Sequence, residues 1–305
     1  MQTEAGNTRS EAGKGILLMC IGIALLTVND ALAKNLTSGY SVFQILFIRN
    51  MIALPFALLI AFGLGGKAAL ISHRPSAHLL RGLLWLGAAF QFITSLRYLG
   101  LAEATTLVFI APAIITAISA LFLGEQVGWR RWSAVIAGFV GVLIAVQPGS
   151  ATFQLASLLS LGTAFFYAFL MVGARFVDPR DSVWTLMLYL VMFGALFSGI
   201  VSAFVWQPVA SSDLPFFAAL ALTGTIGTTL VTQAFRFAPS AIIAPFDYTA
   251  LLWATLLGWL FWGEQPGFAV LVGAAIIMAS GLYIVWREHR HNKQPLSETS
   301  LADRM

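Results

Sequence analysis

Long apolar runs separated by short polar segments fill almost the whole chain. A helix needs about 20 apolar residues to cross a bilayer. Ten stretches meet or approach that length: 15–33, 43–63, 79–99, 104–123, 132–147, 154–174, 183–205, 215–235, 241–262 and 266–286. The pattern predicts ten transmembrane helices, with polar tails over 1–14 and 287–305. The first run also imitates a signal peptide cleaved after Ala31-Leu32-Ala33, an alternative that would leave nine spans.

Composition supports a membrane location and excludes a soluble fold. Of the 305 residues, 59% are hydrophobic and 10% are charged, against about 25% charged in an ordinary soluble domain. The lone Cys20 lies inside the first apolar run, and the four histidines lie in polar segments. We therefore predict an all-α integral membrane protein with no metal site and no cofactor. The net charge of +4 gives no reason to expect a nucleic-acid partner.

Basic residues are distributed unevenly between the two sets of loops. If the N-terminus is cytoplasmic, fourteen Lys and Arg residues fall in the inner segments, and the outer segments hold Lys34 and Arg97 alone. An excess of Lys and Arg marks cytoplasmic loops. We predict a multi-pass protein of the cell inner (cytoplasmic) membrane, with both termini in the cytoplasm.

The chain repeats itself at an offset of 139 residues. Arg97-Tyr98 aligns with Arg236-Phe237, and Gly124-Glu125-Gln126 aligns with Gly263-Glu264-Gln265. Each half, 15–147 and 154–286, holds five predicted spans, so the halves must enter the membrane in opposite senses. Inverted repeats of this kind are typical of secondary transporters. Because the repeat places Glu125 and Glu264 at opposite faces, we expect them to cap helices rather than to catalyse a reaction.

These motifs resemble the EamA type of the drug/metabolite transporter superfamily. The resemblance rests on the five-plus-five spans, on Arg97-Tyr98 and on the Gly-Glu pair that closes spans four and nine. It implies a central cavity between the halves and transport of amino acids, vitamins, nucleotides or other small metabolites. The segment Ala244-Pro245-Phe246-Asp247-Tyr248, followed by Leu252-Trp253-Ala254, is similar to the branch that contains riboflavin and S-adenosylmethionine uptake proteins.

Ionisable residues at membrane depth are the first functional candidates, because lipid makes them costly. Asp30 and Arg49 fall toward the outer ends of spans one and two, where they form either a structural ion pair or a ligand contact that breaks during gating. Asp247, in span nine, is a proton-coupling or ligand-binding group, or it forms a bridge to Arg236 or to a neighbouring helix. Arg97 and Arg236 would lie at opposite ends of the cavity as gate or anchor positions.

Polar and aromatic positions on four spans predict the lining of the cavity. In span three, Gln91, Thr94 and Ser95 share one face at helical spacing. The same face is suited to helix packing, an alternative that stays open. Pro112 and Pro245 should interrupt spans four and nine, either as simple kinks or as breaks whose freed carbonyls meet substrate, as in many transporters. The predicted substrate-binding residues are Trp85, Gln91, Thr94, Ser95, Tyr98, Thr228, Thr232, Gln233, Asp247, Tyr248 and Trp253.

Two further groups of side chains have structural interpretations. Small residues on spans five and ten, such as Gly141 and Gly273, predict packing faces, either within the chain or in a homodimer. Several tryptophans are expected to form an interfacial belt: Trp129, Trp132, Trp184, Trp262 and Trp286.

The predicted function is secondary transport of a small-molecule substrate across the lipid bilayer. An aromatic, neutral-polar lining suits a planar heteroaromatic metabolite, which makes riboflavin the first single candidate and an amino acid or S-adenosylmethionine the next. An intramembrane enzyme with an Asp30–Asp247 dyad, a channel and a sensory module are the alternatives from other classes. The chain has no His-Glu-x-x-His, Gly-x-Ser-x-Gly or Walker A element, so we expect no enzymatic activity. Substrate identity, direction, proton coupling and oligomeric state are left open.

Overall fold

The protein is described by a computed structural model that covers residues 2–122, 124, 127–150, 153–237 and 240–292. Regular secondary structure in these ranges is entirely helical, as predicted. The α-helices are α1 Gln2–Leu36, α2 Val42–Gly65, α3 Pro75–Ser95, α4 Leu101–Val108, α5 Ala111–Phe122, α6 Trp129–Val146, α7 Ser157–Gly173, α8 Val183–Ser202, α9 Leu214–Phe237, α10 Ser240–Ile243, α11 Thr249–Trp262 and α12 Phe268–Asn292. Four 3-10 turns accompany them: η1 Lys67–Leu70, η2 Ala174–Phe176, η3 Ser211–Asp213 and η4 Ala244–Tyr248.

By length and composition, seven helical segments of the described chain are able to cross a membrane. They are Gly13–Leu36, Val42–Gly65, Leu101–Phe122, Trp129–Val146, Val183–Ser202, Ser211–Phe237 and Phe268–Trp286. The other three predicted spans are helical but less regular. Helix α3 carries His78 and Arg81, α7 is an apolar helix of 17 residues, and the ninth run is divided among α10, η4 and α11. The protein is therefore an all-helical, multi-pass membrane protein.

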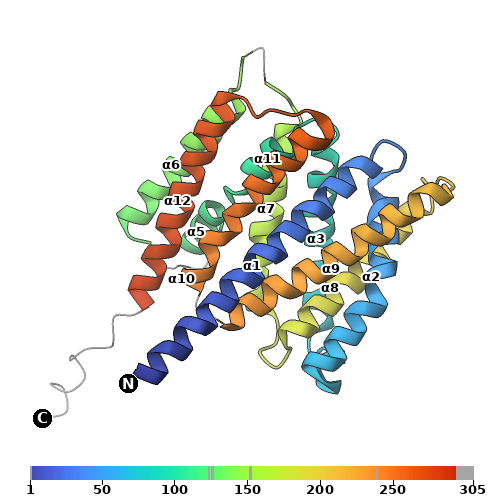
Figure 1. Ribbon diagram of the computed structural model, residues 1–305, viewed down its shortest axis with the longest axis horizontal. Coiled ribbons are helices and arrows are strands. Elements are labelled where there is room, and N and C mark those ends of the chain that lie inside the picture. The colour runs from blue at the N-terminus through green and yellow to red at the C-terminus, as the bar shows by residue number, and fades with distance from the viewer. Residues whose placement is uncertain (1, 123, 125–126, 151–152, 238–239, 293–305) are drawn as a thin grey trace, which may run out of the picture.

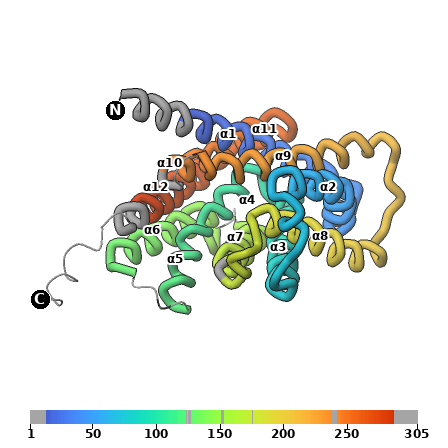
Figure 2. Tube along the Cα trace, turned by 90° about the horizontal axis from the view of Figure 1, so that it is seen from below, coloured from blue at the N-terminus to red at the C-terminus, as the bar shows by residue number. Residues whose placement is uncertain are grey.

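The main helix contacts join the two halves of the chain. Helix α1 packs on α9, α2 on α8, α3 on α7 and α6 on α12. Figure 1 shows α6 and α12 side by side at one edge of the molecule and α2 with α8 toward the opposite edge. In the perpendicular view of Figure 2, α1 and α9 run along one side while α3, α5 and α7 run along the other. The halves thus interlock rather than fold as separate bundles.

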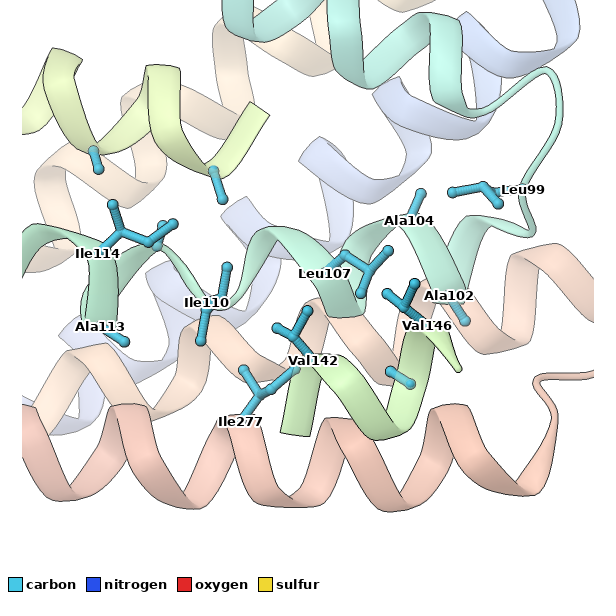
Figure 3. Close-up of a cluster of buried hydrophobic side chains, with 14 of the residues drawn as sticks. Leu99, Ala102, Ala104, Leu107, Ile110, Ala113, Ile114, Val142, Val146 and Ile277 are labelled. Atoms are coloured by element: carbon cyan, nitrogen blue, oxygen red, sulfur yellow. The ribbon is translucent and has the colours of Figure 1, made fainter. Parts of the chain in front are cut away.

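Helix breaks occur in spans four and nine, as the two prolines predict. Helix α4 ends at Val108, and α5 begins at Ala111, just before Pro112. In span nine the break is longer, because Pro245 lies in the 3-10 turn η4. Ile110, at the first break, is 1% exposed. Figure 3 shows its side chain in one apolar cluster with Val142 of α6 and Ile277 of α12, so residues from both halves stabilise the break.

Equivalent glycines of the repeat adopt the same unusual backbone conformation. Gly124 has φ +68° and Gly263 has φ +65°, a left-handed conformation that glycine adopts without the steric cost of a side chain. Gly263 ends α11, and its N–H donates to the Trp259 carbonyl, as in a common helix C-cap. The paired glycines show that the sequence repeat corresponds to a repeated local structure.

The small-residue faces of spans five and ten meet inside the chain. A Cβ placed on Gly141 of α6 would lie 3.0 Å from the Gly273 carbonyl oxygen of α12, and one on Gly273 would lie 2.6 Å from the Gly141 carbonyl oxygen. The Ser280 hydroxyl donates to the Ala134 carbonyl across the same contact, at 2.6 Å. This arrangement is the within-chain alternative; a homodimer through these spans stays a prediction.

Candidate functional site

Two oppositely charged side chains, one on α1 and one on α2, lie at membrane depth. Asp30 and Arg49 are both half-buried and attract each other electrostatically. No ion pair or hydrogen bond joins them among the contacts of the described residues. The Arg49 guanidinium carbon instead lies 5.7 Å from the centre of the Trp85 ring, within the range of a cation–π contact.

Glycines on α8 and α9 let these polar groups approach the neighbouring helices closely. A Cβ on Gly224 of α9 would lie 2.7 Å from Arg49 Nη2 and 2.9 Å from Asn29 Nδ2. On α8, a Cβ on Gly194 would lie 2.7 Å from Trp85 Cζ3 and 2.9 Å from Asn50 Nδ2. Five helices, α1, α2, α3, α8 and α9, therefore converge here, and any larger residue in place of either glycine would displace a polar or aromatic side chain.

One buried donor at this point has no hydrogen-bond partner among the residues that the structure describes. Asn50 is 2% exposed, and its Nδ2 makes no hydrogen bond in the described chain. The neighbouring Asn29 amide is satisfied, because its Nδ2 donates to the Leu220 carbonyl of α9. Unpaired buried donors are rare in folded proteins because each costs about 1–3 kcal/mol. Sequence reasoning missed Asn29 and Asn50, although both flank residues that it selected.

The predicted polar face of α3 packs largely against α7. The Ser95 and Ser160 hydroxyls lie 2.9 Å apart, and both residues are fully buried. Gln91 lies directly against Gly162. Thr94, which is half-buried, donates to the Phe90 carbonyl of its own helix at 2.6 Å. Helix packing therefore accounts for Gln91 and Ser95, and their role in substrate binding stays a prediction.

The threonines of α9 bond back to their own helix. The hydroxyls of Thr228 and Thr232 donate to the carbonyls of Gly224 and Thr228, each at 2.8 Å. Both threonines are half-buried. Because each hydroxyl proton is engaged, the oxygens are left to act as acceptors. Gln233 Oε1 accepts from the exposed Arg236 at 3.5 Å, a long contact at the end of α9.

Asp247 lies in the broken span nine among tyrosines. It is half-buried in η4 and interacts electrostatically with Tyr167 of α7 and with Tyr248. The Tyr248 ring lies 4.8 Å from that of Phe109, at the break of span four. The two helix breaks are thus in contact. The predicted bridge from Asp247 to Arg236 is not among the contacts of the described residues.

The other two aromatic candidates lie at the surface. Trp253 is 38% exposed and Tyr98 is 64% exposed. Tyr98 follows Arg97, whose Nη2 donates to the Tyr40 carbonyl at 2.8 Å. No ring contact joins Tyr98 or Trp253 to Trp85 or Tyr248 among the described residues.

A salt bridge lies on the side of the molecule that the charge pattern assigns to the exterior. Lys34 of α1 forms an ion pair with Glu264, and its Nζ also donates to the Leu99 carbonyl at 2.7 Å. Glu264 Oε2 accepts from the Leu101 N–H at 2.8 Å. It therefore caps the start of α4, in agreement with the expectation that Glu264 caps a helix. A pocket of about 190 Å³ lies beside it, between Glu103 and Thr255. Its repeat equivalent, Glu125, lies outside the described residues.

A polar cluster on the predicted cytoplasmic side joins two loops that sequence reasoning did not connect. Asp181 Oδ2 lies 2.9 Å from His78 Nε2, and Asp181 Oδ1 lies 2.7 Å from His73 Nδ1. Burial raises the pKa of the Asp181 carboxyl, but hydrogen bonds from His78, His73 and Ser72 outweigh it and hold that pKa well below its usual range. Because 108 residues separate His73 from Asp181, no local sequence signal marks this pairing.

The fold and these contacts define a polytopic helical membrane protein whose two halves enclose polar and charged groups. The profile of the EamA-like transporter family matches residues 13–147 and 154–286. The chain therefore belongs to this family.

Several curated proteins are similar over most of the chain. An S-adenosylmethionine uptake transporter of Rickettsia bellii is 26% identical over 281 residues, covering 90% of this chain and 94% of that protein. A riboflavin transporter of Vibrio cholerae is 27% identical over 280 residues, covering 91% and 94%. A riboflavin transporter of Rhizobium johnstonii is 30% identical over 231 residues, covering 75% and 76%. Together they support transport of a small metabolite as the function.

One solved structure shares the fold. It superposes with a TM-score of 0.61 at 18% identity and covers 92% of this chain and 99% of that chain. Its title says only that it is the crystal structure of a protein, so this likeness concerns the fold alone.

Proposed function

We propose that this protein is a secondary carrier that moves a small metabolite across the cytoplasmic membrane by alternating access. In this proposal ten helices form two inverted repeats of five, with both termini in the cytoplasm. The observation that carries it is the pairing of α1 with α9, α2 with α8, α3 with α7 and α6 with α12. In each pair the first-named helix belongs to the first repeat of the sequence and the second-named to the second, so every pair joins the two repeats. A carrier of this class works by rocking one repeat against the other around a central site.

The substrate in this proposal contains a planar heteroaromatic ring. Trp85 supplies an aromatic surface near the half-buried Arg49, and Tyr167 and Tyr248 supply aromatic surfaces near the half-buried Asp247. Riboflavin is the first candidate on ring chemistry alone, and relatives named as riboflavin transporters agree with it. S-adenosylmethionine, whose adenine is also planar, is the second candidate and is named for other relatives.

Uptake into proteoliposomes tests this proposal. Labelled riboflavin, S-adenosylmethionine and amino acids are each offered with and without a pH gradient, and saturation and counterflow are measured. A carrier gives saturable flux and accelerated exchange against unlabelled substrate inside the vesicle. If neither flux nor counterflow is detected for any compound, the carrier proposal fails for this panel. Flux that is indifferent to the pH gradient removes proton coupling but leaves the carrier intact.

Asp247 is tested in the same assay. We expect Asp247→Asn to lower the flux of the transported compound, because the variant loses the carboxylate of η4. Asp178→Asn is the matched control, since Asp178 is paired with Arg180 in a loop and we assign it no part in transport. Equal flux in the two variants would exclude Asp247 from the transport site.

A further inference from the structure

The groups around Arg49 form a polar site whose capacity for hydrogen bonds is not fully used by the described part of the chain. Asp30 and Arg49 carry opposite charges and are not paired directly in the described chain. Asn50 Nδ2 is enclosed and has no hydrogen-bond partner in the ranges that the structure describes. Trp85 offers an aromatic ring beside the guanidinium. The site thus combines a carboxylate that can pair with a cation, from Asp30, with two hydrogen-bond donors that can bind an anion, from Arg49 and Asn50. The Trp85 ring adds a flat apolar surface.

A purely structural ion pair would look different. Charges at membrane depth are costly unless they are paired, and a pair that only stabilises a hairpin gains most when its hydrogen bonds are formed. Here the nearest neighbours of the guanidinium include Gly224 and the Trp85 ring, which supply no hydrogen-bond acceptor from a side chain. A ligand that carries both charges would satisfy Asp30, Arg49 and Asn50 together.

We propose that Asp30 and Arg49 bind the head group of a zwitterionic ligand that also carries a planar ring. The guanidinium of Arg49 and the amide of Asn50 donate to the ligand carboxylate, the Asp30 carboxylate accepts from the ligand ammonium, and Trp85 packs against the ring. This assignment rests on the proposed carrier function and narrows it. A zwitterionic ligand pairs with both charges and leaves the site neutral when bound, whereas a ring compound without charged groups pairs with neither Asp30 nor Arg49.

Glycine accounts for the shape of the site. With any side chain at Gly224 or Gly194, Arg49, Asn29, Asn50 or Trp85 would have to move, since the Cβ alone would approach them within 3.0 Å. These glycines therefore allow the donors of Arg49 and Asn50 to lie directly against α9 and α8.

A series of ligands tests the charges one at a time on the unchanged protein. L-tryptophan carries both head-group charges, tryptamine only the ammonium, and indole-3-propionate only the carboxylate, on the same ring. S-adenosylmethionine and its decarboxylated form make a second matched pair, and riboflavin represents an uncharged ring. Dissociation constants are measured by competition with labelled S-adenosylmethionine and labelled riboflavin on the purified protein. We expect loss of either charge to weaken binding by about 10- to 100-fold, the effect of a lost charged hydrogen bond.

Variants then assign each charge to a residue. In Arg49→Gln the preference for carboxylate-bearing ligands should disappear while the affinity for tryptamine is kept. In Asp30→Asn the preference for ammonium-bearing ligands should disappear while the affinity for indole-3-propionate is kept. Arg49→Lys should restore part of the carboxylate preference, and Arg180→Gln, a change at an exposed loop pair, should alter nothing. A merely structural pair would weaken all ligands equally.

The outcomes separate this assignment from the carrier proposal. Riboflavin binding that is as tight as that of the zwitterions and unaffected by either variant would overturn the head-group site while leaving a carrier. Equal binding of L-tryptophan, tryptamine and indole-3-propionate, or no binding of any zwitterion, would also overturn it. Selective zwitterion binding without flux or counterflow would support the site and refute the carrier.

Discussion

Replacing Gly273 with alanine tests how tightly the two halves of the protein are joined. The added Cβ would lie 2.6 Å from the Ala145 Cβ and 2.6 Å from the Gly141 carbonyl oxygen. Real Cβ atoms do not make contacts this short, and one of the two partners is backbone, which cannot rotate away. Helices α6 and α12 would therefore have to separate along their contact.

The magnitude follows from comparison with a glycine that has free space. Overpacking a close contact costs about 1–3 kcal/mol, whereas alanine is favoured over glycine in a helix by about 1 kcal/mol. Gly63 of α2 is the matched control, because a Cβ there would meet nothing within 4 Å. Since both changes are glycine to alanine within helices, the propensity gain cancels, and we expect Gly273→Ala to be less stable than Gly63→Ala by about 1–3 kcal/mol.

Reversible unfolding of the purified protein in mixed detergent micelles, followed by tryptophan fluorescence, measures this difference. Gly141→Ala should be destabilised in the same direction, because its Cβ would lie 3.0 Å from the Gly273 carbonyl oxygen. The two glycines share one contact, so the double variant should lose less than the sum of the single losses. If Gly273→Ala is as stable as Gly63→Ala, the close crossing of α6 and α12 is refuted.

Two further predictions concern polar contacts at opposite ends of the molecule. Glu264→Ala leaves Lys34 without its anionic partner and the Leu101 N–H without its acceptor. Thermal unfolding should therefore show a loss of stability of roughly 1.5–3 kcal/mol. A loss of stability no larger than that of Gln265→Ala, at an exposed neighbour, would contradict this role. Asp181 has a depressed pKa in the folded protein, so its contribution is present above the unfolded carboxyl pKa of about 3.9 and is lost as the pH falls below it. The midpoint of wild-type unfolding should therefore fall more steeply below about pH 4 than that of Asp181→Asn, and parallel curves would exclude this linkage.

The positions of the helices and their breaks were predictable because both depend on local sequence. Apolar runs long enough to cross lipid identify the helices, and proline cannot donate the hydrogen bond that continues a helix. The breaks at Pro112 and Pro245 lie where these rules place them. The left-handed glycines Gly124 and Gly263 follow from a residue type that tolerates positive φ.

Which helix faces which was not predictable, because lipid removes the polarity contrast that marks a buried face in water. Trp184 illustrates this: we expected it in an interfacial belt, but it is only 6% exposed and packs beside Gly65. Trp129, expected in the same belt, is 75% exposed. Both tryptophans stand near a helix start, so their local sequence gives no sign of the difference.

The same limit applies to the candidate site. Asp30 and Arg49 stand out because charged residues are rare in apolar runs. Whether the two side chains form an ion pair, and whether Arg49 contacts Trp85, depends on how α1, α2 and α3 pack. Asn50 gave no signal by itself, since an asparagine in a membrane helix satisfies its amide in many different packings. The paired loops of His73 and Asp181 depend on the interlocking of the halves, which a single half does not specify.

The interlocking also relates the polar contacts at the two ends of the molecule. Tyr40, in the loop before α2, donates to Asp213, just before α9, at 2.6 Å. Asp181, in the loop before α8, contacts His73, just before α3, at 2.7 Å. Each contact joins the loop between the first two spans of one half to the loop between the second and third spans of the other, so the two are equivalent by the repeat. Both contacts are hydrogen bonds, whose net contribution is modest because water bonds the same groups once they separate. The α6–α12 contact, by contrast, is close-packed at Gly141 and Gly273 and includes the hydrogen bond from Ser280 to Ala134. If the protein is a carrier, its halves would therefore separate at one polar end at a time while α6 and α12 stay joined, and the charged site at Arg49 would open to alternate sides.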